Sequence, residues 1–435
     1  MTKGLALART FYAAGHDVIG ADFEPHQIPV NGRFSRSLRR FYRLEPGERY
    51  VASLKEVFLA ERIELWVSCS GVASAVEDGI AAEVLGKHGV QAVQFGVEVT
   101  SMLHEKDSFI KNTAELGLSV PQTILVTCEE DALAVLHPEE GEDELGGRKF
   151  ILKPVGMEDG SRADMTLLPR ACANDTRAHI RKMKPTVTRP FVLQRFIDGK
   201  EYCTHALIVN NHVKTFTACE SADILMHYMP LPVDSALYRA MLQYTQVYVR
   251  DMRKLDKAMT GHFSIDFLVE DEGAMSLVDK LCPIECNPRA HTAVVLLNDE
   301  NERMSEAYLS ALPDHDPKAV SNGKERTDIV TSKSRTAYYW IGHDLITRLV
   351  LPIFDLLRLK IGIRGLIWKW SEFAWHVWAW KDGTWEIWDP WPFWWLYAIY
   401  WPTMFTLCIL RLMGLVKGNG RWSRMNVSTL KMFAC

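Results

Sequence analysis

The stretch Ile284-Glu285-Cys286-Asn287-Pro288-Arg289-Ala290-His291-Thr292 carries the most information in this chain. Its first residues are typical of a β-strand, in which side chains two residues apart share one face. The oxygens of Glu285 and Asn287 could therefore bind one hard cation, and Arg289 follows with a permanently charged guanidinium group. Such a set suits a magnesium–nucleotide phosphate site. The alternative is an edge strand with a solvated glutamate and a turn ended by proline.

The composition limits the number of domains and the class of protein. At 435 residues the chain exceeds the usual size of a single core, so roughly two to four packed units are expected. A net charge of −4 with 24% charged residues argues against a nucleic-acid-binding protein. The 9 cysteines include no Cys-x-x-Cys pair, which predicts neither a disulfide framework nor a zinc site. No basic-then-apolar leader opens the sequence, so we expect a cytoplasmic protein.

Residues 1–100 alternate helix-like and strand-like runs, which predicts a parallel α/β unit. The unit opens on a helix, whereas a unit of this kind normally begins with a strand and a glycine-rich turn. We therefore expect either that the start is placed too late or that the first strand is lost. Residues 313–336 are polar and rich in turn formers, which predicts a linker.

A second carboxylate can join the first. Residues 261–269 alternate apolar and polar side chains like a half-buried strand that contains Asp266. A turn at 271–273 would pair this strand with the one that carries Glu285 and Asn287. The three side chains would then bind one or two Mg²⁺ ions, with Mn²⁺ as a substitute. A solvated strand carboxylate is the plainer interpretation of Asp266.

Two lysines are candidates for binding phosphates. Lys153 ends an apolar strand, residues 149–154, and precedes a glycine-containing loop. A point charge beside backbone donors suits a phosphate, although a lysine at the end of a strand is more often a surface residue. Lys106 begins a helix and is the weaker candidate of the two.

The remaining candidates concern a nucleotide base, a ribose and proton transfer. A backbone hinge could present amide groups to an adenine edge, Glu201 could accept ribose hydroxyl groups, and His205 or His291 could act as an acid, a base or a substrate contact. For each histidine a purely structural role is the alternative. The hinge consists of Gln194, Arg195, Phe196 and Ile197.

The order of these parts resembles the ATP-grasp superfamily over roughly residues 1–310. Further stretches are similar to the ATP-grasp ligases that form mycosporine-glycine, and this likeness extends into the C-terminal region. These stretches are 2–9, 199–205, 284–291, 339–341 and 389–393.

The resemblance implies a fold and a division into domains. It implies an α/β (α+β) ATP-grasp fold with a Rossmann-like pre-ATP-grasp domain that lacks its first strand, and a Trp-rich helical C-terminal extension. The domains would be 1–100, the ATP-grasp domain 101–312, the linker 313–336 and the C-terminal region 337–435. Within the ATP-grasp domain, a small lid would span 120–193 and a metal-binding part 194–312.

The resemblance also implies roles for the candidate residues. ATP and Mg²⁺ would be the cofactors, and a small-molecule acceptor and an amino acid the partners. Arg289 and His291 would be catalytic; Lys106, Lys153, Gln194, Arg195, Phe196, Ile197 and Glu201 would bind ATP; and Asp266, Glu285 and Asn287 would bind the metal.

Three functions are compatible with these residues. The first is an ATP-dependent C–N ligase that joins a glycine-like amino acid to a cyclohexenone such as 4-deoxygadusol. The second is a carboxylate–amine ligase that acts through an acyl phosphate. The third is a catalytically degenerate protein that binds nucleotide or membrane, which Arg195 in the hinge and the long interval between Asp266 and Glu285 would favour.

The C-terminal region is rich in tryptophan and differs from the rest of the chain. Residues 390–410 carry no charged side chain and would reach about 30 Å as a helix, enough to cross a bilayer. Tryptophan and tyrosine, however, are typical of the membrane interface, and both flanks are basic. We expect either a helical segment lying on the membrane over 385–415, a buried aromatic helix, or a true span.

Overall fold

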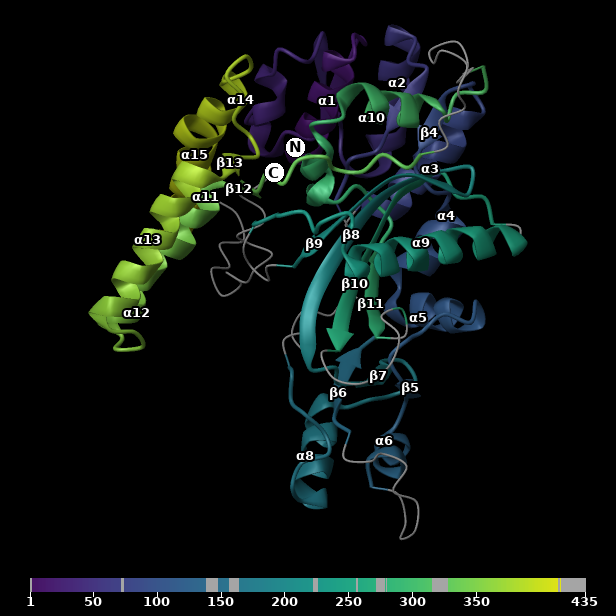
Figure 1. The fold of residues 1–435 in the computed structure, drawn as a ribbon, viewed down its shortest axis with the longest axis vertical. Helices are drawn as coiled ribbons and strands as arrows, with labels where there is room; N and C mark the ends of the chain where they lie inside the picture. Colours follow the sequence, from purple (N-terminus) through teal and green to yellow (C-terminus); the bar gives the residue numbers. More distant parts are fainter. Residues whose placement is uncertain are drawn as a thin grey trace.

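The computed structural model describes residues 2–71, 74–137, 148–155, 164–221, 226–255, 257–270, 278, 280–314, 328–413 and 415. Most of the glycine-containing loop after Lys153 and the turn at 271–273 lie outside these residues. In Figure 1 two parts extend away from the main body. One is a small lid built around β5–β7, and the other is an arm formed by α12 and α13.

The N-terminal unit contains parallel strands joined by helices, as the alternation predicted. β1 pairs only with β2, and β3 only with β4, among the described strands. A cavity of about 490 Å³ lies between the two pairs, lined by backbone and side chains of β1, β3, α1 and α2. Among the described strands the two pairs therefore do not join into one sheet. Its elements are α1 Thr2–Ala13, β1 Ile19–Asp22, η1 Pro25–Gln27, η2 Asn31–Phe34, β2 Arg40–Arg43, η3 Gly47–Arg49, α2 Tyr50–Glu61, β3 Leu65–Val67, α3 Ala75–Gly86, β4 Gln91–Val93 and α4 Val97–His104.

A four-stranded antiparallel sheet, ordered β11-β10-β8-β9, forms the centre of the molecule. α9 covers one face because Tyr238, Met241, Tyr244 and Tyr248 recur every three or four residues and are buried. Ser235 caps this helix by accepting a hydrogen bond from the backbone of Tyr238. The elements of this part are α5 Lys106–Glu115, β8 Gly199–Val209, β9 His212–Glu220, α9 Ala236–Lys254, β10 Gly261–Glu270, β11 Leu281–Asn287, η5 Thr292–Leu297 and α10 Asn301–Leu309.

The lid is a three-stranded antiparallel sheet ordered β5-β7-β6. Its core contains Phe150, Ile180, Phe191 and Leu193, which pack the sheet against two helices. The lid lies below β10 and β11 in Figure 1, with its strand β6 nearest to them. The elements are β5 Thr123–Val126, α6 Glu129–Leu136, β6 Phe150–Pro154, α8 Ala173–Met183 and β7 Phe191–Arg195.

The C-terminal region is helical and folds back on the N-terminal unit. Asp389 is fully buried and accepts hydrogen bonds from Arg9 (2.9 Å), from Ser35 (2.6 Å) and from the backbone of Arg36 (2.9 Å). At Gly342 a Cβ atom would lie 2.5 Å from the rings of Tyr397 and Trp401, so only glycine fits this contact. The elements are β12 Tyr338–Tyr339, α11 Ile341–Asp344, η6 Leu345–Val350, α12 Leu351–Leu357, α13 Ile363–Ala379, β13 Lys381–Asp382, α14 Trp391–Trp394, η7 Trp395–Tyr400 and α15 Trp401–Leu412.

Candidate active site

Two carboxylates face each other across neighbouring strands. β10 and β11 are antiparallel, and their register places Asp266 opposite Glu285. The register shifts just after Asp266, so a β-bulge lies beside the carboxylates. The amide nitrogen of Asn287 lies 3.2 Å from Asp266 Oδ2 and 3.3 Å from Glu285 Oε1, and donates to both. The pairing predicted from strand alternation is confirmed, and the three side chains lie together.

The two carboxylates have opposite protonation preferences. Burial of Asp266 beside the Glu285 carboxylate raises the pKa of Asp266 well above its usual value. Burial would raise the pKa of Glu285, but the ammonium group of Lys106 together with hydrogen bonds to Asp266 and Asn287 lowers it to about 2. The atom Asp266 Oδ1 is buried and has no hydrogen-bond partner among the described residues. A buried acceptor without a partner is costly, and a hard divalent cation bound by these oxygens would remove that cost.

Two lysines reach the same space from different elements. Lys106 begins α5, and its Nζ lies 2.7 Å from Glu285 Oε2. Lys153 lies on β6 of the lid, and its Nζ donates to Gln194 Oε1 at 3.3 Å. Burial, together with the positive charge of Lys106, lowers the pKa of Lys153 to about 8. Two cations near two carboxylates could bind an anionic ligand whose charge compensates the lysines.

Arg289 lies beside the carboxylate pair and is hydrogen-bonded to Asn287. Its guanidinium Nη2 donates to Asn287 Oδ1 at 3.1 Å, and its Nε has no partner among the described residues. Burial lowers the pKa of Arg289, while the carboxylates of Asp266 and Glu285 oppose that shift. An arginine stays protonated despite such a shift. Its unpartnered donor could therefore bind an incoming phosphoryl oxygen or a carboxylate.

The two candidate histidines are neighbours, but their environments differ. The backbone N–H of His291 donates to Nδ1 of His205 at 3.4 Å, and Nδ1 of His291 accepts from the backbone of Ala293 at 3.2 Å. His205 is fully buried, and burial lowers its pKa to about 3. His205 therefore stays neutral at physiological pH and cannot act as a proton carrier there. His291 caps η5 and packs against Tyr228.

The predicted hinge joins the lid to the central sheet. Gln194 and Arg195 end β7, and the backbone N–H groups of Arg195 and Phe196 donate to Gln122 and Lys149 at 2.8 and 2.7 Å. Ile197 is buried. Glu201 lies at the start of β8, where Ser221 Oγ donates to it at 2.7 Å. The negative charge of Glu201 opposes the lowering of the pKa of Lys153, and Lys153 donates to Gln194 of the hinge, so these residues lie near one another.

One residue near the site was not among the candidates. Lys3 of α1 donates from Nζ to the backbone oxygens of Ser70 at 2.5 Å and of Ala290 at 2.9 Å. It therefore ties the turn between Arg289 and His291 to the N-terminal unit. Lys3 and Ala290 lie far apart in the chain and form no local sequence pattern, so the sequence could not reveal this contact.

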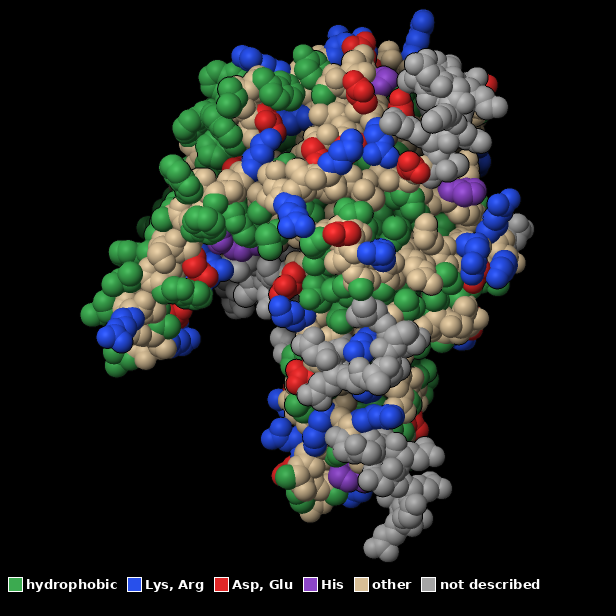
Figure 2. Space-filling model, viewed as in Figure 1, with side chains coloured by type: hydrophobic (Ala, Val, Ile, Leu, Met, Phe, Trp, Pro, Cys, Tyr) green, Lys and Arg blue, Asp and Glu red, His purple; other side chains and the backbone are tan. Residues whose placement is uncertain are grey.

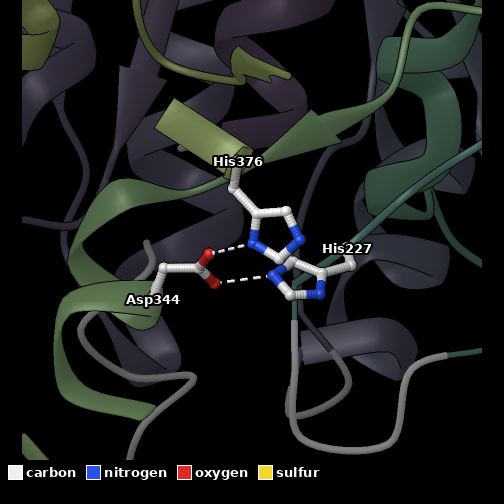
Figure 3. Close-up of side chains that lie close together, drawn as sticks. All are labelled: His227, Asp344 and His376. Atoms are coloured by element: carbon white, nitrogen blue, oxygen red, sulfur yellow. Dashed lines mark hydrogen bonds and ion pairs between the residues drawn. The ribbon is translucent and has the colours of Figure 1, made fainter. Parts of the chain in front are cut away.

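A second group of titratable side chains lies outside this site. Figure 3 shows Asp344 of α11 between His227 and His376, at the joint between the central sheet and the C-terminal helices. His227 Nε2 lies 2.6 Å from Asp344 Oδ1, and His376 Nδ1 lies 2.5 Å from Asp344 Oδ2. Two nitrogens and a carboxylate are a donor set that zinc accepts, but ligands of one tetrahedral ion lie roughly 3.3 Å apart. The shorter distances describe hydrogen bonds, so this cluster is a joint between two parts of the chain.

Comparison with known proteins identifies the architecture. No family model matches the sequence, and no curated protein matches it. An N5-carboxyaminoimidazole ribonucleotide synthetase in complex with ADP has a TM-score of 0.54 at 15% identity, covering 82% of this chain and 83% of that chain. The biotin carboxylase domain of a single-chain bacterial carboxylase has a TM-score of 0.51 at 15% identity, covering 74% and 68%. Phosphoribosylamine–glycine ligase from Thermotoga maritima has a TM-score of 0.50 at 12% identity, covering 77% and 76%. The antiparallel sheet with its lid, the α/β N-terminal unit and these likenesses together show that the chain has the ATP-grasp fold.

Proposed function

We propose that this protein is an ATP-dependent ligase that forms a C–N bond. The observation that carries the proposal is the convergence of Asp266, Glu285, Asn287, Lys106 and Arg289 beside a hinged lid. Phosphoryl transfer depends on positioning and on stabilising negative charge, and this set supplies both. The structurally similar synthetase is described as an ADP complex, and the similar Thermotoga protein as a ligase for glycine, which supports the same reaction class.

The residues would divide the work as follows. Lys106 and Lys153 would hold the phosphates of ATP, with Gln194, Arg195, Phe196 and Ile197 around the adenine and Glu201 at the ribose. Asp266, Glu285 and Asn287 would hold Mg²⁺, which supplies charge neutralisation at the phosphates when it is bound. Arg289 would stabilise the transferring phosphoryl group with its buried guanidinium donors.

We further propose the acceptor class: a cyclohexenone such as 4-deoxygadusol, with glycine or a similar amino acid as the amine. The γ-phosphoryl group of ATP would pass to the enolic oxygen, and ADP would leave. The amine nitrogen would then attack the carbon bearing the phosphate, the C–O bond would break, and inorganic phosphate and one proton would leave. The product is an enaminone. The resemblance of several sequence stretches to ligases that form mycosporine-glycine supports this acceptor.

His291 would act in this reaction as a hydrogen-bond donor. Its Nδ1 accepts the backbone N–H of Ala293, so the proton of the neutral imidazole lies on Nε2. A donor at Nε2 can stabilise the oxygen of the acceptor while phosphate departs, but it cannot take a proton at that atom. This assignment narrows the acid–base role that the sequence left open for His291.

A carboxylate–amine ligase is the second candidate, because the similar Thermotoga enzyme is named as a phosphoribosylamine–glycine ligase. The two reactions would use the same ATP residues and differ in the acceptor, which would form an acyl phosphate. The degenerate protein is the third candidate, and Arg195 in the hinge remains its main support.

One assay separates these candidates. Purified protein is incubated with Mg-ATP and glycine, with and without 4-deoxygadusol, while phosphate release and ultraviolet absorbance are followed. We expect phosphate release that depends on both substrates and a new enaminone absorbance. Phosphate release with a carboxylate in place of the cyclohexenone, without the chromophore, would favour the second candidate. ATP binding without turnover on any acceptor would favour the third.

We also propose a cytoplasmic location with contact to a membrane through residues 385–415. Within the described residues, one helical stretch is long and apolar enough to cross a bilayer, Trp391–Arg411, with a mean hydropathy of 1.3. Only 18% of its most apolar window is buried, which supports an exposed helix over a core helix. Length and composition alone are weak evidence for a span. The tryptophans favour a position in the interface.

A further inference from the structure

The arm formed by α12 and α13 leaves large apolar side chains unpartnered. Four of them are Leu357 (73% exposed), Leu359 (90%), Ile363 (68%) and Trp378 (87%). Figure 1 shows that this arm extends beyond the body, and Figure 2 shows apolar and basic side chains together near its tip. Exposed apolar side chains that gather on a projecting element usually mark a site that binds another protein or a membrane.

The tip of the arm combines apolar and cationic groups within eight residues. The segment 357–364 contains Arg358, Lys360 and Arg364 between the exposed apolar side chains. Asp355 is the one acidic neighbour, 4.0 Å from Lys360, and the described residues give neither arginine an ion pair. This mixture contains lysine as well as arginine, and lysine is depleted in the core of a protein–protein interface, where arginine is enriched. It suits a phospholipid surface, where leucine enters the acyl boundary and the cations meet the phosphates.

The backbone at the tip holds an exposed leucine in an unfavourable conformation. Leu359 has φ of 58°, in the left-handed region that glycine and asparagine adopt more easily. A large apolar side chain that is both strained and 90% exposed contributes nothing to the fold of the described chain. Its presence is explained if the side chain is buried in another phase.

The helix behind the tip also exposes aromatic side chains. Trp368, Trp370 and Trp375 of α13 are exposed in addition to Trp378, and the ammonium group of Lys369 lies 4.4 Å from the ring centre of Trp368. Tryptophan beside lysine is typical of side chains at the level of lipid headgroups. The acidic residue of this helix, Glu372, is neutralised by Arg348 at 2.6 Å and by Lys369 at 3.3 Å. No uncompensated negative charge therefore opposes an anionic surface here.

We propose that the α12–α13 arm inserts its tip into the surface of an anionic phospholipid membrane. The arm lies outside residues 385–415, and the proposal is independent of the ligase reaction. Leu357, Leu359 and Ile363 enter the acyl boundary, and Arg358, Lys360 and Arg364 bind lipid phosphates. Trp368, beside Lys369, lies at the headgroups. The arm then holds the ATP-grasp domain at the membrane.

The test uses the full chain and vesicles of phosphatidylcholine alone or with phosphatidylserine. Sedimentation and the shift of tryptophan fluorescence are measured for the wild type, for Leu357→Asn with Leu359→Asn, and for the control Val187→Asn. Val187 is 81% exposed on the lid, so it matches the change without touching the arm. Asparagine tolerates the left-handed conformation at 359, so the double variant should fold at least as well as the wild type.

We expect the wild type and the control to bind phosphatidylserine vesicles equally well. The double variant should bind them more weakly, by about tenfold or by a larger factor. The proposal would be overturned if the double variant bound the vesicles as tightly as the wild type, or if the wild type did not bind them. Loss of binding in Trp391→Ser with Trp394→Ser, but not in the arm variant, would assign the contact to residues 385–415 alone. A change of oligomeric state in the arm variant without lipid would show that the arm binds a second copy of the chain.

Discussion

Lys106 Nζ lies 2.7 Å from Glu285 Oε2, so a cation from the protein already occupies one side of the carboxylate pair. This ion pair explains why the pKa of Glu285 stays low although the residue is buried. A metal ion that binds the carboxylates must compete with this ammonium group. When ATP binds, its phosphates can form the ion pair with Lys106 in place of Glu285, and the carboxylates can then bind the metal ion.

The first prediction concerns that competition. In Lys106→Met the carboxylates of Glu285 and Asp266 lose their positive neighbour, so Mn²⁺ should bind the ATP-free protein more tightly, while KM for ATP rises. The measurement is a Mn²⁺ titration by electron paramagnetic resonance together with ATP kinetics. Lys149→Met is the control, because Lys149 lies on the lid and donates to the backbone of Pro169 rather than to either carboxylate. Weaker Mn²⁺ binding in Lys106→Met would contradict the competition.

The second prediction follows from the pKa of Lys153, which is lowered to about 8. The lysine loses its charge as the pH rises through this value, so kcat/KM for ATP should fall about tenfold per pH unit above 8. Lys153→Arg keeps the positive charge at every accessible pH and should remove this decline. The measurement is a pH profile of kcat/KM between neutral pH and about pH 10. An unchanged profile in Lys153→Arg would assign the ionisation to another group.

The third prediction separates stability from activity at Asp266. The pKa of Asp266 is raised in the folded protein. Its favourable contribution to the free energy of unfolding is therefore present at low pH and is lost as the pH rises through the pKa of the folded state. Asp266→Asn removes the buried charge and can still accept the hydrogen bond of Asn287. We expect a higher Tm of the metal-free protein at neutral pH and a loss of Mg-dependent turnover on the order of 100-fold or more. Thermal unfolding with and without Mg²⁺ and turnover are measured. A variant that is less stable without metal would contradict this account of Asp266.

The fourth prediction concerns the joint at Asp344. Burial alone would raise its pKa, but hydrogen bonds from His227 and His376 hold the pKa below its usual value. Asp344→Asn turns one acceptor into a donor that faces a histidine, so we expect a loss of about 1–3 kcal/mol and faster proteolysis of the C-terminal helices. The control is Asp355→Asn, which changes a carboxylate whose side chain is 41% exposed.

The effect at Asp344 also has a defined pH dependence. A depressed folded pKa gives stability that is present above the unfolded pKa and is lost as the pH falls through the folded value. The difference between wild type and Asp344→Asn should therefore shrink in acid, below the ordinary aspartate range of about 3.9. A difference that grows in acid would show that the histidines, rather than the carboxylate, control the joint.

The sequence predicted the site to the extent that its residues follow a local pattern. Alternation over 261–269 placed Asp266 on a strand, and the register then brought it opposite Glu285, as expected. His227, Asp344 and His376 had no such pattern, because Asp344 lies 117 and 32 residues from its partners. The contact of Lys3 with Ala290 spans 287 residues and was missed for the same reason. Long-range polar contacts depend on how whole elements pack, and a single sequence does not encode that in any short window.

The exposed arm was missed for a different reason. The uncharged, Trp-rich run predicted membrane contact for residues 385–415, and no such prediction was made for the residues of α12 and α13. Only the packing shows that the apolar side chains of the tip have no partner in the described chain. A hydrophobic residue in a sequence does not reveal whether it will be buried in the protein or in something else.

The central claim is that Glu285 holds the metal of a phosphoryl-transfer site. Its most direct test is Mg-dependent phosphate release by Glu285→Ala in the presence of ATP, glycine and 4-deoxygadusol, with circular dichroism to verify the fold. We predict that the variant keeps its fold and releases no phosphate above the background without enzyme, whatever the Mg²⁺ concentration. Phosphate release at the wild-type rate by the folded variant would contradict the metal role of Glu285 and the function proposed for this site.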